Sequence, residues 1–240
     1  MEEQSVERAR ALIDLGRADR ARIILTGILA VEPEHVEALL VLSLAQADDE
    51  PRASLENAQR VLSIEPENLL ALLLCADACL ELNRVTDAER YARLALDKSP
   101  WLGAAHAVLA QALGRRGGRY EESRQSAQRA IELDPENAIG YVAAGYIEMA
   151  RAEWSEADRW FRKALEVDPS DRTAQVNLVT AQEGRGRISP AFNEAAVLLR
   201  IDPRDKDALQ VLHETVYTTL VHLLWISTLL FVIAWATGTA

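Results

Sequence analysis

Few residues in this chain have types and spacings that suggest chemistry, and two cysteines come first among them. Cys75 and Cys79 lie four residues apart, which places both thiols on one face of a helix. A metal site needs further ligands, and no other ligand lies within reach of this pair in the sequence. Helix geometry disfavours a disulfide at this spacing, and a reducing cytosol would break one. We interpret both cysteines as apolar side chains packed between helices, and we expect no metal site.

The histidines do not complete a catalytic motif. His213 and Glu214 begin the pattern of a zinc protease, but Tyr217 stands where the second histidine belongs. No serine or cysteine combined with a histidine and an acid stands out, and neither does a pair of carboxylates. We therefore expect no catalytic residue and no cofactor, and we expect that the protein is not an enzyme.

Residues 114–119 (GRRGGR) form a basic, glycine-rich segment in an acidic protein. Such a turn could hold a phosphate or an anionic lipid headgroup on its backbone N–H groups. It lacks the Gly-Lys-Ser/Thr ending of a phosphate-binding loop. The segment also lies in the longest of the repeat units described next, so one inserted turn residue explains it. A plain turn is the favoured interpretation.

The elements that would position these residues follow from a regular series of prolines. Six prolines recur at spacings of 33 to 35 residues, at Pro33, Pro66, Pro100, Pro135, Pro169 and Pro203. Proline ends a helix because it lacks an N–H and clashes with the preceding turn. A period of about 34 residues, closed each time by a proline, is typical of stacked helix–turn–helix units. The chain is therefore predicted to be an all-α repeat array, an architecture that favours binding over catalysis.

Local signals mark where individual helices start and stop. Residues 138–147 and 158–167 carry apolar side chains at helical spacing. Residues 86–89 (TDAE) and 155–158 (SEAD) resemble capping boxes, which would start two helices there. Pro51 and Pro190 suit the first turn of a helix. Turns are predicted at residues with a permissive backbone: Gly16, Asn83, Gly117, Gly118 and Gly186.

This pattern resembles the tetratricopeptide repeat family over residues 1 to about 215. In the family's first helix a large side chain is paired with small ones, as in Tyr141, Ala144 and Gly145. The small and aromatic positions of the second helix and its closing proline match Ala157, Phe161, Ala164 and Pro169. No unit carries the family's first-helix tryptophan. The resemblance implies a tetratricopeptide-like alpha solenoid, a right-handed superhelix with about six helix–turn–helix repeats over residues 1–205.

A second feature lies near the other end of the chain. Residues 216–236 are 21 consecutive residues without a formal charge. As a helix they would span roughly 31 Å, close to the hydrocarbon thickness of a bilayer. We predict a single transmembrane helix over residues 216–236, with a capping helix that starts a seventh repeat at 206–215 and a short tail at 237–240. A buried terminal helix of the array is the alternative.

The side chains expected to anchor this span in the membrane are Tyr217, His222, Trp225 and Trp235. His222 lies inside the span, and ionisable groups in membranes often mark function. A neutral histidine bonded to a neighbouring helix is the alternative interpretation.

All charged residues precede Val216, so the repeat region carries the whole net charge of −11. This excess of acid argues against binding of nucleic acid, which needs a basic surface. The first residues contain no apolar signal segment, and Arg200, Arg204 and Lys206 precede the span. We therefore expect a single-pass protein of the cell membrane with a cytoplasmic repeat domain. The arginine- and alanine-rich composition hints at a bacterial source.

In this family the first helix of each unit lines a concave groove. By register, the groove-facing residues are predicted to be Leu39, Leu40, Ser43, Leu73, Leu74, Asp77, Val108, Gln111, Val142 and Tyr146. These positions are mostly apolar, so the basic clamp with which some members hold a C-terminal carboxylate is not matched. We expect a protein or peptide partner, as an amphipathic helix or an extended apolar segment, besides membrane lipid. Packing of these leucines against neighbouring helices is the alternative.

Two function classes follow. The leading one is a membrane-anchored adaptor or scaffold that mediates protein–protein interactions at the cytoplasmic face. The alternative is a regulatory or assembly segment of a larger multi-span membrane protein, a transporter or an enzyme. The partner and the oligomeric state are not predicted.

Overall fold

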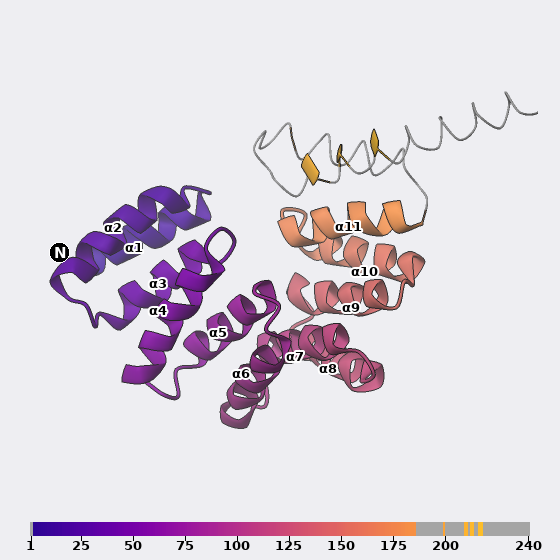
Figure 1. Ribbon diagram of the computed structural model, residues 1–240, viewed down its shortest axis with the longest axis horizontal. Coiled ribbons are helices and arrows are strands. Elements are labelled where there is room, and N and C mark those ends of the chain that lie inside the picture. The colour runs from indigo at the N-terminus through magenta and orange to yellow at the C-terminus, as the bar shows by residue number, and fades with distance from the viewer. Residues whose placement is uncertain (1, 186–198, 200–208, 211, 214–215, 218–240) are drawn as a thin grey trace, which may run out of the picture. The chain divides into compact units, whose positions relative to one another are not determined.

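The computed structural model describes residues 2–185, 199, 209–210, 212–213 and 216–217. Residues 2–185 form α-helices joined by short turns and contain no strand, which confirms the all-α prediction for this part of the chain (Figure 1). The helices are α1 (Glu2–Asp14), α2 (Ala18–Val31), α3 (Val36–Gln46), α4 (Pro51–Ile64), α5 (Leu69–Glu81), α6 (Val85–Lys98), α7 (Gly103–Arg116), α8 (Tyr120–Leu133), α9 (Ala138–Ala150), α10 (Trp154–Val167) and α11 (Arg172–Gly184).

The chain divides into two compact units, Met1–Ala150 and Arg151–Ala240. The first unit contains α1 to α9, and each of these helices packs against the next one in the sequence. The described part of the second unit contains α10 packed against α11. The first unit and the described part of the second therefore consist of helices that fold back on their sequence neighbours, as the proline period predicts.

The helices of the first unit form two layers. Among its odd-numbered helices, α1, α3, α5 and α7 each also contact the next odd-numbered helix, so that α9 ends the series (Figure 1). No even-numbered helix of this unit contacts another even-numbered one. Helices that contact one another on one side of an array, and are separated on the other side, make the array curve. The side with the contacts becomes the concave side. We call α1, α3, α5, α7 and α9 the inner layer, and α2, α4, α6 and α8 the outer layer.

The two layers meet in a core of leucine, alanine and cysteine side chains. One cluster of buried side chains joins α4 to α7 and includes Leu72, Ala88 and Leu113. Small residues let the helices approach closely, which is why alanine dominates the contact positions. Cys75 and Cys79 are buried free thiols in this cluster, and burial raises the pKa of Cys75 to about 12. The interpretation of the cysteines as packed apolar side chains is confirmed.

Five of the six repeat prolines mark helix ends as predicted, and Pro203 lies outside the described residues. Helices α2, α4, α6, α8 and α10 each end two residues before Pro33, Pro66, Pro100, Pro135 or Pro169. The next helix begins three residues after the same proline. Its N-terminus is capped in four cases by the residue directly before it, His35, Asn68, Asn137 or Asp171, whose side chain accepts a hydrogen bond from a backbone N–H of the first turn.

The two predicted capping boxes are wrong. Helix α6 begins at Val85 after Arg84, and α10 begins at Trp154 after Glu153, and neither preceding residue forms a side-chain cap. The physical reason is the tight turn between the two helices of a unit. A left-handed residue, Asn83 at φ 56° or Ala152 at φ 57°, redirects the chain and starts the helix earlier than the capping residues.

Other turn predictions hold within the described residues. Gly16, Gly117 and Gly118 have positive φ angles, which favour glycine. Pro51 is the first residue of α4. Gly186 and Pro190 lie outside the described residues.

Residues 218–236 of the predicted transmembrane span lie outside the described residues, and so do most residues of the predicted capping helix. Among the described helices none is both long enough and apolar enough to cross a bilayer.

Candidate protein-binding surface

Five of the ten predicted groove residues belong to the core and cannot contact a partner. They are Leu39, Ser43, Leu74, Val108 and Val142, all of them buried. The Ser43 hydroxyl shows the reason, because its Oγ lies 2.9 Å from the main-chain carbonyl oxygen of Ser54 on α4. Each inner helix is packed against inner neighbours and against the outer layer, so only a narrow stripe of it stays accessible.

The other five predicted residues, Leu40, Leu73, Asp77, Gln111 and Tyr146, are partly exposed. Leu40 and Leu73 also pack against the large core cluster. Leu70 was not predicted, although it lies one turn before Leu73 on α5 and is 49% exposed. The spacing 70, 73, 77 and 81 on α5 could have identified it, since residues at these intervals share one face of a helix.

Three polar or aromatic residues form a row across the inner layer. Asp77, Gln111 and Tyr146 occupy the same position in three successive repeats, at intervals of 34 and 35 residues. Their helices α5, α7 and α9 contact one another in that order. We call the accessible residues on these three helices the inner-layer surface: Leu70, Leu73, Asp77, Glu81, Gln111, Arg115 and Tyr146.

Arg115 links the three helices of this surface. Its Nη1 donates a hydrogen bond of 2.6 Å to the main-chain carbonyl oxygen of Leu80 on α5. Its guanidinium carbon lies 5.8 Å from the centroid of the Tyr146 ring on α9, within the range of a cation–π interaction. The cation is therefore engaged by the protein itself.

Asp77 has no such partner and lies on α5 one turn after Leu73 and one turn before Glu81. Burial raises the pKa of its carboxyl group to about 7, and the negative charge of Glu81 one turn further on adds to the shift. Neither an ion pair nor a hydrogen bond joins the Asp77 side chain to any described residue. The inner-layer surface thus combines apolar area with a carboxylate that is costly to keep charged.

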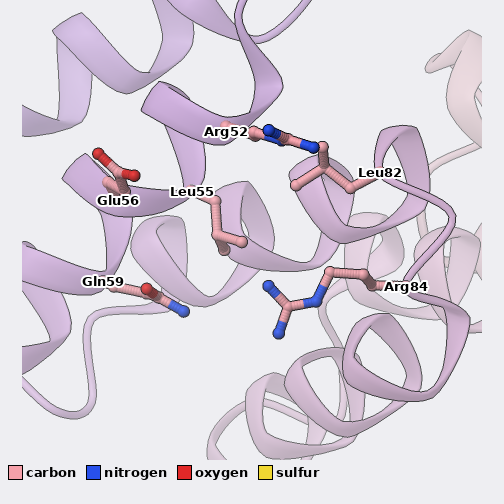
Figure 2. Close-up of a pocket in the computed structure, with 6 residues that line it drawn as sticks. All are labelled: Arg52, Leu55, Glu56, Gln59, Leu82 and Arg84. Atoms are coloured by element: carbon pink, nitrogen blue, oxygen red, sulfur yellow. The ribbon is translucent and has the colours of Figure 1, made fainter.

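A second candidate site is a pocket of about 430 Å³ formed by α4 and the turn between α5 and α6 (Figure 2). It is lined by Arg52, Leu55, Glu56, Gln59, Leu82 and Arg84. Arg84 is already paired with Asp87, and Gln59 donates a hydrogen bond to the hydroxyl of Tyr91. In Figure 2 the guanidinium of Arg84 is turned toward Gln59, and the Glu56 carboxylate is turned away from it. The mixed charges of this lining favour no single ligand.

Two of the three arginines in the basic segment 114–119 are paired with acids of the protein. Nη1 of Arg116 lies 2.9 Å and Nη1 of Arg119 lies 2.8 Å from carboxylate oxygens of the buried Glu89. Arg93 also pairs with Glu89. Burial opposes ionisation of Glu89, but hydrogen bonds from these three arginines outweigh it and lower its pKa. These contacts favour the plain turn over a phosphate site.

The remaining predicted site residues are few. Tyr217 is exposed, and His222, Trp225 and Trp235 lie outside the described residues. Within the part of the chain that the structure describes, no three histidine, cysteine or acidic side chains come together as metal ligands would.

Comparison with known proteins agrees with this architecture. A family model described as tetratricopeptide repeat matches residues 6–50, 45–100 and 108–171. No curated protein sequence is similar enough to match the chain.

Three solved structures illustrate the likeness of fold. TTC0263, a tetratricopeptide repeat protein of Thermus thermophilus, is 19% identical, with 90% of this chain and all of that chain covered and a TM-score of 0.62. PilW, a type IV pilus biogenesis factor, is 17% identical, with 88% and 98% covered and a TM-score of 0.61. Human IFIT1, solved as a dimer with m7Gppp-AAAA, is 18% identical, with 83% and 50% covered and a TM-score of 0.68.

Proposed function

This chain belongs to the tetratricopeptide repeat family, and we propose that it is a scaffold that holds a protein partner against its inner-layer surface. The observation that carries the proposal is the row of partly exposed side chains on α5, α7 and α9. Leu70 leaves about half of its area in water, and Leu73 and Tyr146 extend the apolar area. Apolar area gathered on one face usually marks an interaction site, and tyrosine is a frequent anchor at interfaces.

An acidic surface also bears on the class of partner. IFIT1 is a relative in fold that was solved with a capped RNA. A net charge of −11 repels the phosphates of such a ligand. A protein segment is therefore the partner that the composition favours.

The test is a comparison of partner capture between matched variants. The full chain is purified from detergent-solubilised membranes and its bound proteins are identified by mass spectrometry. The double variant Leu70→Gln, Tyr146→Gln should lose the partner and keep its helical circular dichroism. The control Leu94→Gln changes an exposed leucine of the outer helix α6, 39% exposed, and should keep the partner. A partner that stays bound to the folded double variant contradicts the proposal.

The second part of the proposal is that residues 216–236 anchor the scaffold in the cell membrane, with the repeats on the cytoplasmic side. Its support is the uncharged run and the aromatic residues Tyr217, Trp225 and Trp235 within it. The chain should stay with membranes during carbonate extraction, and a variant that lacks residues 216–240 should be released. A full chain that is monodisperse without detergent contradicts the anchor.

The alternative to a separate adaptor is a regulatory or assembly segment of a larger multi-span membrane protein. The genomic reading frame after Ala240 distinguishes the two, since only the larger protein requires further apolar spans there.

A further inference from the structure

Asp77, which is partly exposed, differs from the buried acids of the described part of the chain in having no cation beside it. Glu89 is paired with three arginines, Arg93, Arg116 and Arg119. Asp158 of the second unit is paired with Arg162 and Arg185. Each of these acids is buried together with the cations that compensate for its lost hydration.

Glu148 is also a buried acid paired with an arginine, at a longer distance. Its Oε1 lies 3.7 Å from Nε of Arg124. Asp77, by contrast, has Glu81 as its charged neighbour, and this neighbour carries the same sign. The nearest cation on the inner-layer surface, Arg115, is held by the Leu80 carbonyl oxygen and the Tyr146 ring. The protein thus leaves one partly exposed carboxylate without a compensating cation, and does so on its accessible apolar face.

We infer that the inner-layer surface binds an amphipathic helix of a partner protein that carries a lysine or arginine among its apolar residues, and that Asp77 and Glu81 receive this basic side chain. The inference rests on the proposed function and adds the charge of the partner. The apolar residues of the partner helix would cover Leu70, Leu73 and Tyr146, and its cation would restore the compensation that Asp77 lacks.

A bound metal ion is a weaker explanation of the same carboxylates. Asp77 and Glu81 are two acids on one helix, and no third ligand of the described part of the chain joins them. A cation delivered on an apolar helix also accounts for Leu70, which a metal ion does not.

The test uses three synthetic peptides that differ at a single position. Each is a 16-residue, fluorescein-labelled helix with leucines on one face and a lysine, a glutamine or a glutamate at the centre of that face. Binding to the full chain in detergent micelles is followed by fluorescence anisotropy. We expect the lysine peptide to bind at least about tenfold more tightly than the glutamate peptide, a difference of about 1.4 kcal/mol. The preference should shrink as salt is raised.

Two variants assign this preference to Asp77. Asp77→Asn should reduce the affinity for the lysine peptide to that for the glutamine peptide, and Asp77→Lys should reverse the preference. Asp97→Asn is the matched control, because it makes the same chemical change at an exposed site on the outer helix α6 and should leave the preference intact. Circular dichroism establishes that each variant is folded.

The outcomes distinguish a failure of the role of Asp77 from a failure of the proposed scaffold function. Peptides that bind with equal affinity whatever their charge overturn the role of Asp77 and leave the scaffold function standing. A lysine preference that survives in the folded Asp77→Asn variant also overturns it. Failure of all three peptides to bind at millimolar concentration contradicts both the inference and the use of this surface for an apolar helix.

Discussion

Nη1 of Arg115 on α7 donates a 2.6 Å hydrogen bond to the main-chain carbonyl oxygen of Leu80 on α5. That carbonyl belongs to the last turn of α5 and also accepts a hydrogen bond from the backbone N–H of Asn83 in the following turn. The same guanidinium lies over the Tyr146 ring of α9. One side chain thus joins three successive inner helices and fixes the spacing of the surface that we propose for partner binding.

The first prediction concerns this link. Arg115→Ala should lower the free energy of unfolding by about 1–2 kcal/mol, because a charged hydrogen bond and a cation–π contact are lost. Denaturation by urea of the full chain in detergent measures the change. Arg90→Ala is the control, since Arg90 is an exposed arginine beside the ring of its sequence neighbour Tyr91 and makes no contact between inner helices. Equal midpoints for Arg115→Ala and the unchanged protein would contradict the link.

The second prediction concerns Asp77 and pH. Its pKa in the folded protein, about 7, is above the ordinary 3.8, so the unfolded chain loses this proton first as pH rises. The contribution of Asp77 to stability is therefore complete below pH 4 and is lost as the pH rises from about 4 to about 7. Asp77→Asn should stabilise the protein by about 1–3 kcal/mol at pH 8 and leave it nearly unchanged at pH 4. A stability difference that is the same at both pH values contradicts this account of Asp77.

The third prediction concerns two glycines of the first unit. A Cβ at Gly140 of α9 would lie 2.9 Å from Cγ1 and 3.0 Å from the backbone nitrogen of Ile131 on α8. Gly140→Ala should therefore cost about 1–3 kcal/mol, because the backbone of α8 must move. A Cβ at Gly27 of α2 meets nothing within 4 Å, so Gly27→Ala should stabilise its helix by up to about 1 kcal/mol. A Gly140→Ala variant that melts at or above the temperature of the unchanged protein contradicts the close approach of α9 to α8.

The fourth prediction concerns Glu89. Glu89→Ala removes the common acceptor of three arginines and leaves Arg93, Arg116 and Arg119 to repel one another. We expect a loss of about 2–3 kcal/mol, less than for a fully buried pair because the arginines remain in contact with water. The pKa of Glu89 is lowered in the folded protein, so its contribution to stability should disappear as pH falls below the usual glutamate range. A loss that persists unchanged in strong acid contradicts the electrostatic origin.

The sequence predicts the array well because proline acts through the backbone alone. Every described second helix ends two residues before its proline, whatever the surrounding side chains are. The helix starts are harder to predict, because capping residues compete with tight turns in fixing the first residue of a helix. Thr86 and Ser155 are good capping residues, yet the tight turns at Asn83 and Ala152 start their helices one residue before them.

The candidate surface could be predicted only in part, because a helical face does not reveal how closely its neighbours approach. Periodicity placed Leu39, Leu73 and Val142 at one repeat position, but Leu39 and Val142 are buried while Leu73 is partly exposed. The sequence also could not predict that Asp77 lacks a compensating cation. This depends on Arg115, which donates its hydrogen bond to the Leu80 carbonyl oxygen and not to a carboxylate.

The most direct test of the central claim is photo-crosslinking from single positions of the two layers in living cells. A photoreactive amino acid replaces Leu70 or Gln111 of the inner layer, or Glu56 or Leu94 of the outer layer. We predict that the two inner positions crosslink to the same partner protein and that the two outer positions do not. Crosslinks to that partner from Glu56 and Leu94, with none from Leu70 and Gln111, would contradict the assignment of the inner-layer surface as the binding site.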